Sequence, residues 1–348
     1  MCGIAGTLGP TAPDAARIQA ALATMDRRGP DASGERVLSF GEQQVALLHT
    51  RLSIIDLDPR ANQPFERDGL VFTYNGEIYN YLEVKADLEA LGHKFQTSSD
   101  TEVLAASWRQ WGPKALDRLE GMWAFAVADT AAGTLTLCRD RFGEKPLYLW
   151  PKDGVLYFAS EIKTLAALAG SAPPVNQTQI LRYLTLGYKS LYKHGDTFFD
   201  GVFELPPSTY LTLKSPKLSP PEFYWQLRHI PRPMSADDAL EGARERLFRS
   251  VELRLRADVP VAFCLSGGID SATLAAIAAK KLGADIHCFS IIDSDERYDE
   301  SANIKTMVDA LGCGHHVTRT STEGFFERMG DIVAYHDAPV ATISYYVH

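Results

Sequence analysis

A cysteine stands at position 2 of the 348-residue chain and is followed by Gly3-Ile4-Ala5-Gly6. If Met1 is removed, Cys2 carries a thiol and a free α-amine on the same carbon. An α-amine has a pKa of about 8, so at neutral pH a useful fraction is unprotonated and can act as general base for the thiol. The chemistry expected of this residue is nucleophilic attack without a separate histidine, although a lone cysteine near a chain end is often an ordinary residue.

Asn75 and Gly76 could supply the hydrogen-bond donors that such an attack requires. They follow a predicted apolar strand at residues 70–74. A glycine lets its backbone N–H approach a ligand closely, and the asparagine amide adds a second donor, which makes the pair a candidate oxyanion hole. Because Asn and Gly are also common turn residues, a plain strand-to-helix turn is the alternative interpretation.

Three charged residues could hold a substrate that carries both a carboxylate and an ammonium group. Arg51 follows a predicted strand at 45–49 and could bind a carboxylate with two N–H groups, whereas Glu77 and Asp100 could bind an ammonium. The plainer interpretations are a surface ion pair for Arg51 and a helix cap for Asp100, because Ser99-Asp100-Thr101-Glu102 has the pattern of a capping box.

A second group of residues, Ser266-Gly267-Gly268-Ile269-Asp270-Ser271, stands where a predicted strand at 259–265 ends and a helix begins. Its backbone N–H groups favour an anion such as pyrophosphate, and Asp270 could hold the Mg²⁺ that accompanies ATP. The spacing and lysine of a Walker A loop are absent. A capped turn without a ligand is the alternative.

The elements that must position these residues change in kind along the chain. Short strands with few helices predict an α+β domain of layered antiparallel sheets and helices over residues 1–212. A Pro-rich linker is expected at 213–234. Over 235–348, strands and helices alternate, which predicts an α/β doubly wound parallel sheet with ligands at the carboxyl ends of its strands. The further predicted strands are 4–8, 123–128, 134–138, 155–159, 286–292 and 315–318, and the predicted helices are 15–27, 81–91, 101–111, 236–256, 301–311 and those starting near 270 and 322.

Composition excludes several classes of protein. Hydrophobic residues make up 45% and charged residues 23%, as in soluble globular proteins. A net charge of −9 without a basic run argues against a nucleic-acid partner. The apolar stretches are too short for a bilayer and no export signal is seen, so a cytoplasmic location without membrane contact is expected. The five cysteines are scattered and contain no CxxC pair, which argues against a disulfide framework or a structural zinc site.

The order of the motifs resembles that of the glutamine-hydrolysing asparagine synthetase family, whose glutaminase domain is a class II, N-terminal-nucleophile (Ntn) amidotransferase. The first 210 residues carry the resemblance in Met1–Gly6, Arg28–Asp31, His49–Asp56, Asn75–Asn80, Ser99–Glu102, Gly121–Ala126 and Arg139–Tyr148. The Ser-Gly-Gly-x-Asp-Ser loop is similar to the pyrophosphate loop of ATP pyrophosphatases. The resemblance implies an Ntn-hydrolase sandwich followed by an ATP-pyrophosphatase-type domain. That second domain is expected to be truncated, because the family's S-G-x-G-x-D-E turn is missing.

The resemblance also implies roles for individual residues. Cys2 would be the nucleophile, with Asn75 and Gly76 as the oxyanion hole. The implied glutamine-binding residues are Arg51, Leu52, Ile54, Asn75, Gly76, Glu77 and Asp100. The implied ATP-binding residues are Leu265, Ser266, Gly267, Gly268, Asp270, Ser271 and Ile291, with Asp270 also on Mg²⁺.

The implied reaction converts ATP, aspartate and glutamine to asparagine, glutamate, AMP and diphosphate, with no organic cofactor and with a homodimer as one possible assembly. Asp337-Ala338-Pro339 departs from the Asp-Glu-Pro of many family members. Another carboxylate, such as a uronic acid of a surface polysaccharide, is therefore an alternative acceptor. A non-catalytic remnant of the fold is the alternative of another class, against which the presence of Cys2, Arg51, Asn75 and Asp270 speaks.

Overall fold

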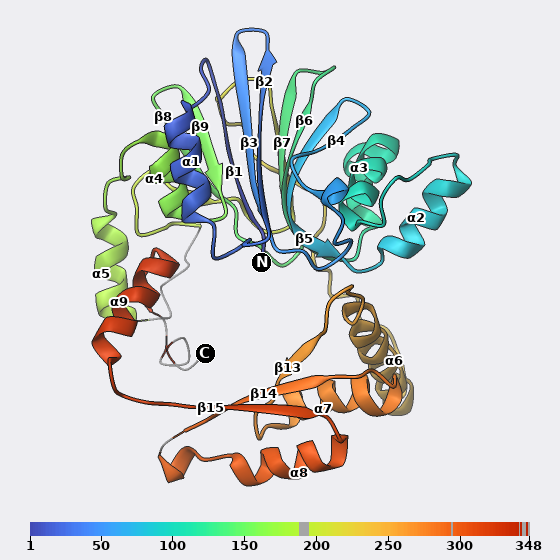
Figure 1. Cartoon of the computed structure of the whole chain (residues 1–348). Coiled ribbons are helices and arrows are strands. Elements are labelled where there is room, and N and C mark those ends of the chain that lie inside the picture. The colour runs from blue at the N-terminus through green and yellow to red at the C-terminus, as the bar shows by residue number, and fades with distance from the viewer. Residues whose placement is uncertain (188–194, 294, 341, 343–345, 347–348) are drawn as a thin grey trace. The chain divides into compact units, whose positions relative to one another are not determined.

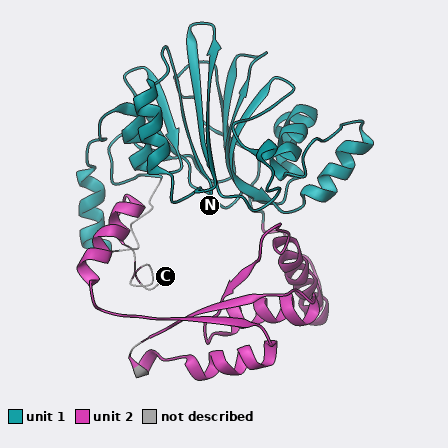
Figure 2. Cartoon of the chain, in the orientation of Figure 1, with its two compact units in different colours: residues 1–228 teal, residues 229–348 magenta. Residues whose placement is uncertain are grey.

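The computed structural model describes residues 1–187, 195–293, 295–340, 342 and 346, and the chain divides into two compact units, residues 1–228 and 229–348 (Figure 2). The boundary between the units falls inside the segment 213–234 that we predicted as a linker. Residues 213–228 belong to the first unit, where strand β12 (Glu222–Phe223) pairs with strand β11 (Thr209–Leu213).

The first unit contains two six-stranded sheets whose neighbouring strands are antiparallel (Figure 1). One sheet has the order β10-β8-β9-β1-β3-β2, with bounds β10 Phe203–Glu204, β8 Tyr148–Lys152, β9 Val155–Ala159, β1 Gly3–Gly9, β3 Gln43–Arg51 and β2 Ala32–Phe40. The other has the order β12-β11-β7-β6-β5-β4, in which the strands not yet given are β7 Thr134–Arg139, β6 Gly121–Asp129, β5 Leu70–Ile78 and β4 Phe65–Arg67.

Side chains that alternate along each strand build the core of this unit. Ile4 and Leu8 of β1 and Val71 of β5 belong to one buried cluster between the sheets, whereas Ala5 packs outward against helices. The outer layers are α1 (Ala15–Thr24) and α4 (Ile162–Ala169) on one sheet and α2 (Tyr81–Ala90) and α3 (Asp100–Trp111) on the other (Figure 1). The predicted layering of antiparallel sheets and helices is confirmed. The unit also holds α5 (Gln177–Leu186) and the 3₁₀ turns η1 (Pro59–Ala61) and η2 (Gly112–Asp117).

Strand β5 differs from the prediction. The apolar run ends at Tyr74, but backbone pairing with β6 continues to Ile78, so that Asn75 lies opposite Ala124. The predicted end of the strand at residue 74 is therefore wrong, and the alternative of a strand-to-helix turn at Asn75 and Gly76 is excluded, because polar residues extend a strand whose neighbour offers hydrogen-bond partners. Helix α2 begins only at Tyr81.

The second unit is built on a three-stranded parallel sheet in the order β13-β14-β15, and the predicted parallel sheet is confirmed. The described strands show no reversal of order, so the switch point that defines a doubly wound sheet is not found among them. The elements are α6 Ala236–Arg254, β13 Ala262–Cys264, α7 Ile269–Ala276 with a π turn at Ile277–Lys281, β14 His287–Ile292, the 3₁₀ turn η5 Glu296–Tyr298, α8 Ser301–Leu311, β15 Gly314–Arg319 and α9 Phe325–His336. In the described part of the chain, no helix has the length and apolarity needed to cross a membrane.

Candidate active site

The register between strands β1 and β3 of the first sheet places Cys2. Gly3 of β1 lies opposite Thr50 of β3, so Cys2 lies beside the end of β3. The Cys2 Sγ is 3.6 Å from the Leu52 carbonyl oxygen and accepts the Leu52 N–H at 3.4 Å. The Cys2 carbonyl accepts a hydrogen bond from Arg28 Nε at 2.9 Å. Burial raises the pKa of the Cys2 thiol, and the bond from Leu52 opposes this shift in part.

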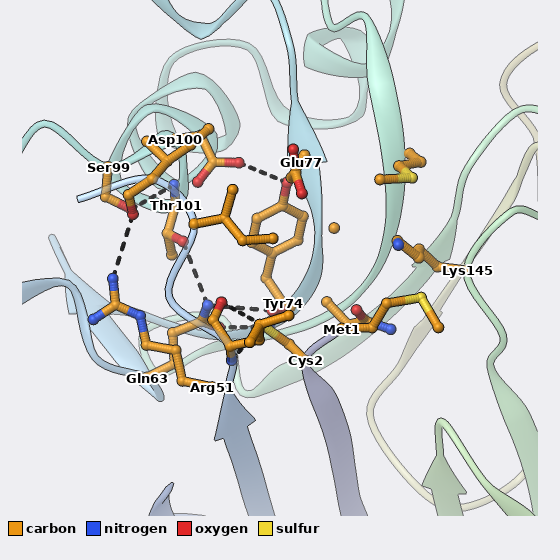
Figure 3. A pocket seen from close by; sticks show the side chains of 16 residues that line it. Met1, Cys2, Arg51, Gln63, Tyr74, Glu77, Ser99, Asp100, Thr101 and Lys145 are labelled. Carbon is orange, nitrogen blue, oxygen red and sulfur yellow. Dashed lines mark hydrogen bonds between the residues drawn. The ribbon is translucent and has the colours of Figure 1, made fainter. Parts of the chain in front are cut away.

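A pocket of about 110 Å³ opens at Cys2 (Figure 3). This volume is well below the roughly 300–1,000 Å³ of sites for drug-sized ligands, so it suits a small substrate. The structure brings every residue that we predicted for glutamine into its wall, namely Cys2, Arg51, Leu52, Ile54, Asn75, Gly76, Glu77 and Asp100.

Strand β5, rather than a turn, places Asn75 and Gly76 at the pocket. The Asn75 side chain is 1% exposed, and among the described residues its Nδ2 has no hydrogen-bond partner. A buried amide without a partner is unfavourable, which indicates that a ligand oxygen belongs there. At Gly76, a Cβ would lie 2.2 Å from the Met122 carbonyl oxygen and 2.8 Å from the Trp123 Cα. Only glycine fits between these strands.

Arg51 is buried rather than exposed, so the surface ion pair considered for it is excluded. Its terminal nitrogens donate to Asp58 O at 3.2 Å, Asn62 Oδ1 at 2.7 Å and Ile55 O at 3.4 Å, and also to Asp56 O. The guanidinium thus fixes the loop after β3 in place. No carboxylate of the described residues pairs with it in an ion pair, so its positive charge is available to the pocket.

Two acidic side chains, Glu77 and Asp100, also line the pocket. The buried Asp100 carboxylate accepts the Tyr74 hydroxyl at 2.8 Å (Figure 3) and the Ile78 N–H at 3.0 Å. Burial raises the pKa of Asp100, and these two bonds oppose the shift. Burial and the nearby Asp100 raise the pKa of Glu77. Two carboxylates that face a cavity in this way suit a cationic ligand.

The predicted capping box is only half formed. Ser99 caps α3 through its side chain, which accepts the Thr101 N–H at 3.1 Å. The Glu102 carboxylate instead accepts the N–H groups of Gln96 and Thr97 and pairs with Arg67. The loop before α3 is thereby tied down at the edge of the pocket.

Sequence reasoning missed several residues of the pocket. Gln63 bridges two elements, because its side chain bonds Tyr74 O at 3.2 Å and Thr101 Oγ1 at 3.4 Å. Lys145 reaches the pocket from the loop between β7 and β8. Neither residue adjoins another site residue in the chain. The one signal for Lys145 was its place inside the family-like run Arg139–Tyr148. The other lining residues without a predicted role are Met1, Ile55, Tyr74, Ser99, Thr101 and Met122.

In the second unit the Ser266–Ser271 loop joins β13 to α7, as predicted. Ser266 Oγ and Ser271 Oγ lie 2.9 Å apart, and the Gly268 N–H donates to Ser266 Oγ at 3.2 Å. The Gly267 N–H donates to the Glu300 carboxylate at 2.9 Å. A carboxylate that already rests on this loop indicates that the loop can bind an anion.

The remaining residues predicted for ATP lie around this loop. Leu265 is buried, its N–H donates to Phe289 O at 2.8 Å, and Ile291 lies half-buried on the neighbouring strand β14. Asp270 stands exposed in the first turn of α7. In the described ranges no three His, Cys, Asp or Glu residues cluster as metal ligands. A Mg²⁺ ion would therefore need the phosphates of its nucleotide besides Asp270, which is the usual arrangement for this ion.

Comparison with known proteins gives a family for each part of the chain. Residues 1–225 match the glutamine amidotransferase domain family, which defines the class of the first unit. Residues 242–347 match the asparagine synthase family. The chain belongs to the glutamine-hydrolysing asparagine synthetase family, in which the two domains occur together.

Curated relatives are similar over nearly the whole chain. Glutamine-hydrolyzing asparagine synthetase 3 of Bacillus subtilis is 32% identical over 334 residues, which cover 91% of this chain and 53% of the relative. Glutamine-hydrolyzing asparagine synthetase 1 of the same organism is 31% identical, and the match covers 98% of this chain and 54% of the relative. Amidase chry2 of Gibberella zeae is 34% identical, and the match covers 94% of this chain and 50% of the relative. The chain thus spans about half the length of the curated relatives it matches.

Proposed function

We propose that the first unit hydrolyses the amide of glutamine. With Met1 removed, the Cys2 α-amine accepts the thiol proton, and Sγ attacks the amide carbon. The developing oxyanion accepts hydrogen bonds from Asn75 Nδ2 and the Gly76 N–H. Ammonia leaves with the proton held by the amine, and water then attacks the thioester to release glutamate. The observation that carries this proposal is the unpartnered Asn75 amide in the same pocket as the Cys2 thiol.

Recognition of glutamine follows from the charges of the two walls. The Arg51 guanidinium faces the α-carboxylate, and Glu77 and Asp100 face the α-ammonium. These contacts hold the amide of the substrate at the sulfur, which converts the attack into an intramolecular step. Leu52 and Ile54 line the apolar methylene groups of glutamine, which lie between its α-carbon and its amide.

In the second unit we propose that ATP with Mg²⁺ activates a carboxylate as its adenylate over the Ser266–Ser271 loop. The backbone N–H groups of Gly267 and Gly268 hold phosphate, Asp270 holds the ion, and Leu265 and Ile291 flank the adenine. Ammonia from the first site then displaces AMP to form an amide. Delivery of neutral ammonia matters because the ammonium ion is not a nucleophile. The protein is expected to work in the cytoplasm.

The acceptor that we propose is aspartate, which gives asparagine. Asparagine synthetases of Bacillus subtilis are among the relatives, and this favours aspartate. An equally similar relative is called an amidase, and Ala338 replaces the glutamate of the Asp-Glu-Pro segment. Amidation of another carboxylate, with uronic acids first, is therefore the second candidate.

Amide-labelled glutamine tests both parts of the proposal. The complete gene product is mixed with the labelled glutamine, Mg-ATP and aspartate, and the label is followed by mass spectrometry. Label in asparagine together with AMP and diphosphate supports the synthetase. Glutamate and labelled ammonia without asparagine support the first site and direct the search to other carboxylates. No glutamate at all would refute glutamine hydrolysis.

A further inference from the structure

Lys145 is a largely buried lysine whose ammonium has no hydrogen-bond or ion-pair partner among the described residues. Its side chain is 5% exposed, and within the described ranges its ammonium forms no hydrogen bond or ion pair. The backbone around it is fixed, because its N–H donates to Asp140 Oδ2 at 2.9 Å and its carbonyl accepts Arg139 Nε at 2.8 Å. The side chain points into the pocket from the side opposite Asp100 (Figure 3).

A lysine whose stem is buried and whose ammonium lines a pocket without an ion-pair partner is unfavourable for folding, so a compensating role in the site is expected. We infer that the Lys145 ammonium keeps the α-amine of Cys2 in its neutral, proton-accepting form and favours the Cys2 thiolate. The inference rests on the proposed glutaminase reaction and assigns a positioning residue to it.

The Lys145 ammonium differs from the other cations around the thiol because, among the described residues, it makes no hydrogen bond or ion pair. The charged and titratable groups that act on Cys2 and Lys145 are the Met1 amine, Arg28, Arg51, Glu77, Asp100 and Glu144. Arg28 forms an ion pair with Glu161 at 3.3 Å, and Lys163 pairs with the same carboxylate at 2.9 Å. When glutamine binds, its carboxylate offsets Arg51 and its single ammonium offsets one of the two acidic side chains of the pocket. The other carboxylate then faces the Lys145 ammonium without forming an ion pair with it in the described structure.

The electrostatic effect has a definite sign. Burial lowers the pKa of Lys145, and Glu77 opposes this shift. A positive neighbour disfavours protonation of an amine and favours ionisation of a thiol. A neutral amine is thus available to take the proton from Cys2 Sγ when the sulfur attacks the amide carbon, and this proton leaves later with ammonia. Lys145 itself gives up no proton and forms no bond in this sequence.

The test compares Lys145→Met and Lys145→Gln, which remove the charge, with Lys145→Arg, which keeps it. Lys114→Met removes a charge from an exposed lysine and serves as the matched control. Folding is checked by circular dichroism, and kcat/KM for glutamine hydrolysis is measured from pH 5 to 10. We expect the acid limb of the profile to move up by about one pH unit in the two neutral variants. It should stay in place in the Arg variant and the control.

A second measurement separates this inference from the proposed function. The rate at which iodoacetamide alkylates Cys2 is followed on the N-terminal tryptic peptide ending at Arg17, since Cys264 and Cys313 are also accessible. We expect slower alkylation at pH 7 in the neutral variants. Unchanged alkylation together with an unshifted acid limb would overturn the role of Lys145. If the parent chain hydrolyses no glutamine, the proposed function fails, and the alkylation rates still decide the role of Lys145.

Discussion

Replacement of Asn75 by alanine should separate activity from stability. Removal of one donor from an oxyanion hole lowers kcat by about 10²–10³. The same change removes a buried Nδ2 that the described structure leaves without a partner. An unsatisfied buried donor costs about 1–3 kcal/mol, whereas the lost packing of so small a side chain costs about 1 kcal/mol. The free energy of unfolding should therefore stay constant or rise by up to about 2 kcal/mol.

Asn80 provides the matched control. It lies at the start of α2, is also buried, and uses both ends of its amide: Nδ2 donates to Arg118 O at 2.9 Å, and Oδ1 accepts the Glu120 N–H at 2.8 Å. Asn80→Ala loses both bonds and should lose about 1–3 kcal/mol of stability. Its kcat for glutamine hydrolysis should change little, because the side chain does not line the pocket.

Urea unfolding at 25 °C and glutamate release at saturating glutamine measure the two quantities for both variants. The reasoning predicts opposite patterns, with lost activity at constant stability for Asn75→Ala and lost stability at constant activity for Asn80→Ala. A variant Asn75→Ala that is destabilised by more than Asn80→Ala, or that hydrolyses glutamine at the parent rate, would refute the assignment of Asn75 as an unpartnered oxyanion donor.

Three further predictions follow from other residues. Cys2→Ala should abolish glutamine hydrolysis and spare amidation with free ammonia in the complete protein. Unchanged glutamate release would contradict the assignment of Cys2 as the nucleophile. Burial lowers the pKa of His49 to about 3, so between its unfolded pKa of 6.5 and about pH 3 only the unfolded state binds this proton. Stability should fall there by about 1.4 kcal/mol per pH unit as pH decreases, and urea titrations at pH 7 and 5 should show a smaller fall in His49→Gln. The Glu300 carboxylate accepts the Gly267 N–H that we propose for phosphate, so Glu300→Gln should bind diphosphate about five-fold more tightly by calorimetry, and weaker binding would count against the proposed role of the loop.

Much of the first unit could be predicted from apolar patterning, whereas strand β2 could not. Strands such as β1 and β3 are apolar and buried, so their sequences indicate them directly. Strand β2 was missed because it alternates half-exposed and exposed residues and contains Ser33, Gly34, Glu35 and Arg36. Its pairing with β3 comes from the sheet rather than from its own composition.

The pocket at Cys2 likewise contains residues that could be predicted from the sequence and residues that could not. Those within recognisable motifs of the first unit were predicted, and they line this one pocket. The environments of these residues could not be predicted, because burial of Arg51 and the extension of β5 through Gly76 depend on contacts between distant segments. Lys145 and Gln63 enter the pocket only through the packing of loops. A sequence pattern does not indicate that a given lysine lacks a partner.

The most direct test of the account is the mass of the N-terminal peptide released by pepsin in acid after the chain has been mixed with glutamine and quenched in acid, because a thioester beside a free α-amine rearranges to an amide at the pH of trypsin digestion. The account predicts a peptide that begins at Cys2, lacks Met1 and carries a glutamyl group as a thioester, which disappears when hydroxylamine is added. The same peptide from Cys2→Ala should stay unmodified. Glutamate release by a chain that retains Met1, or by one whose Cys2 peptide never carries the glutamyl group, would contradict the central claim.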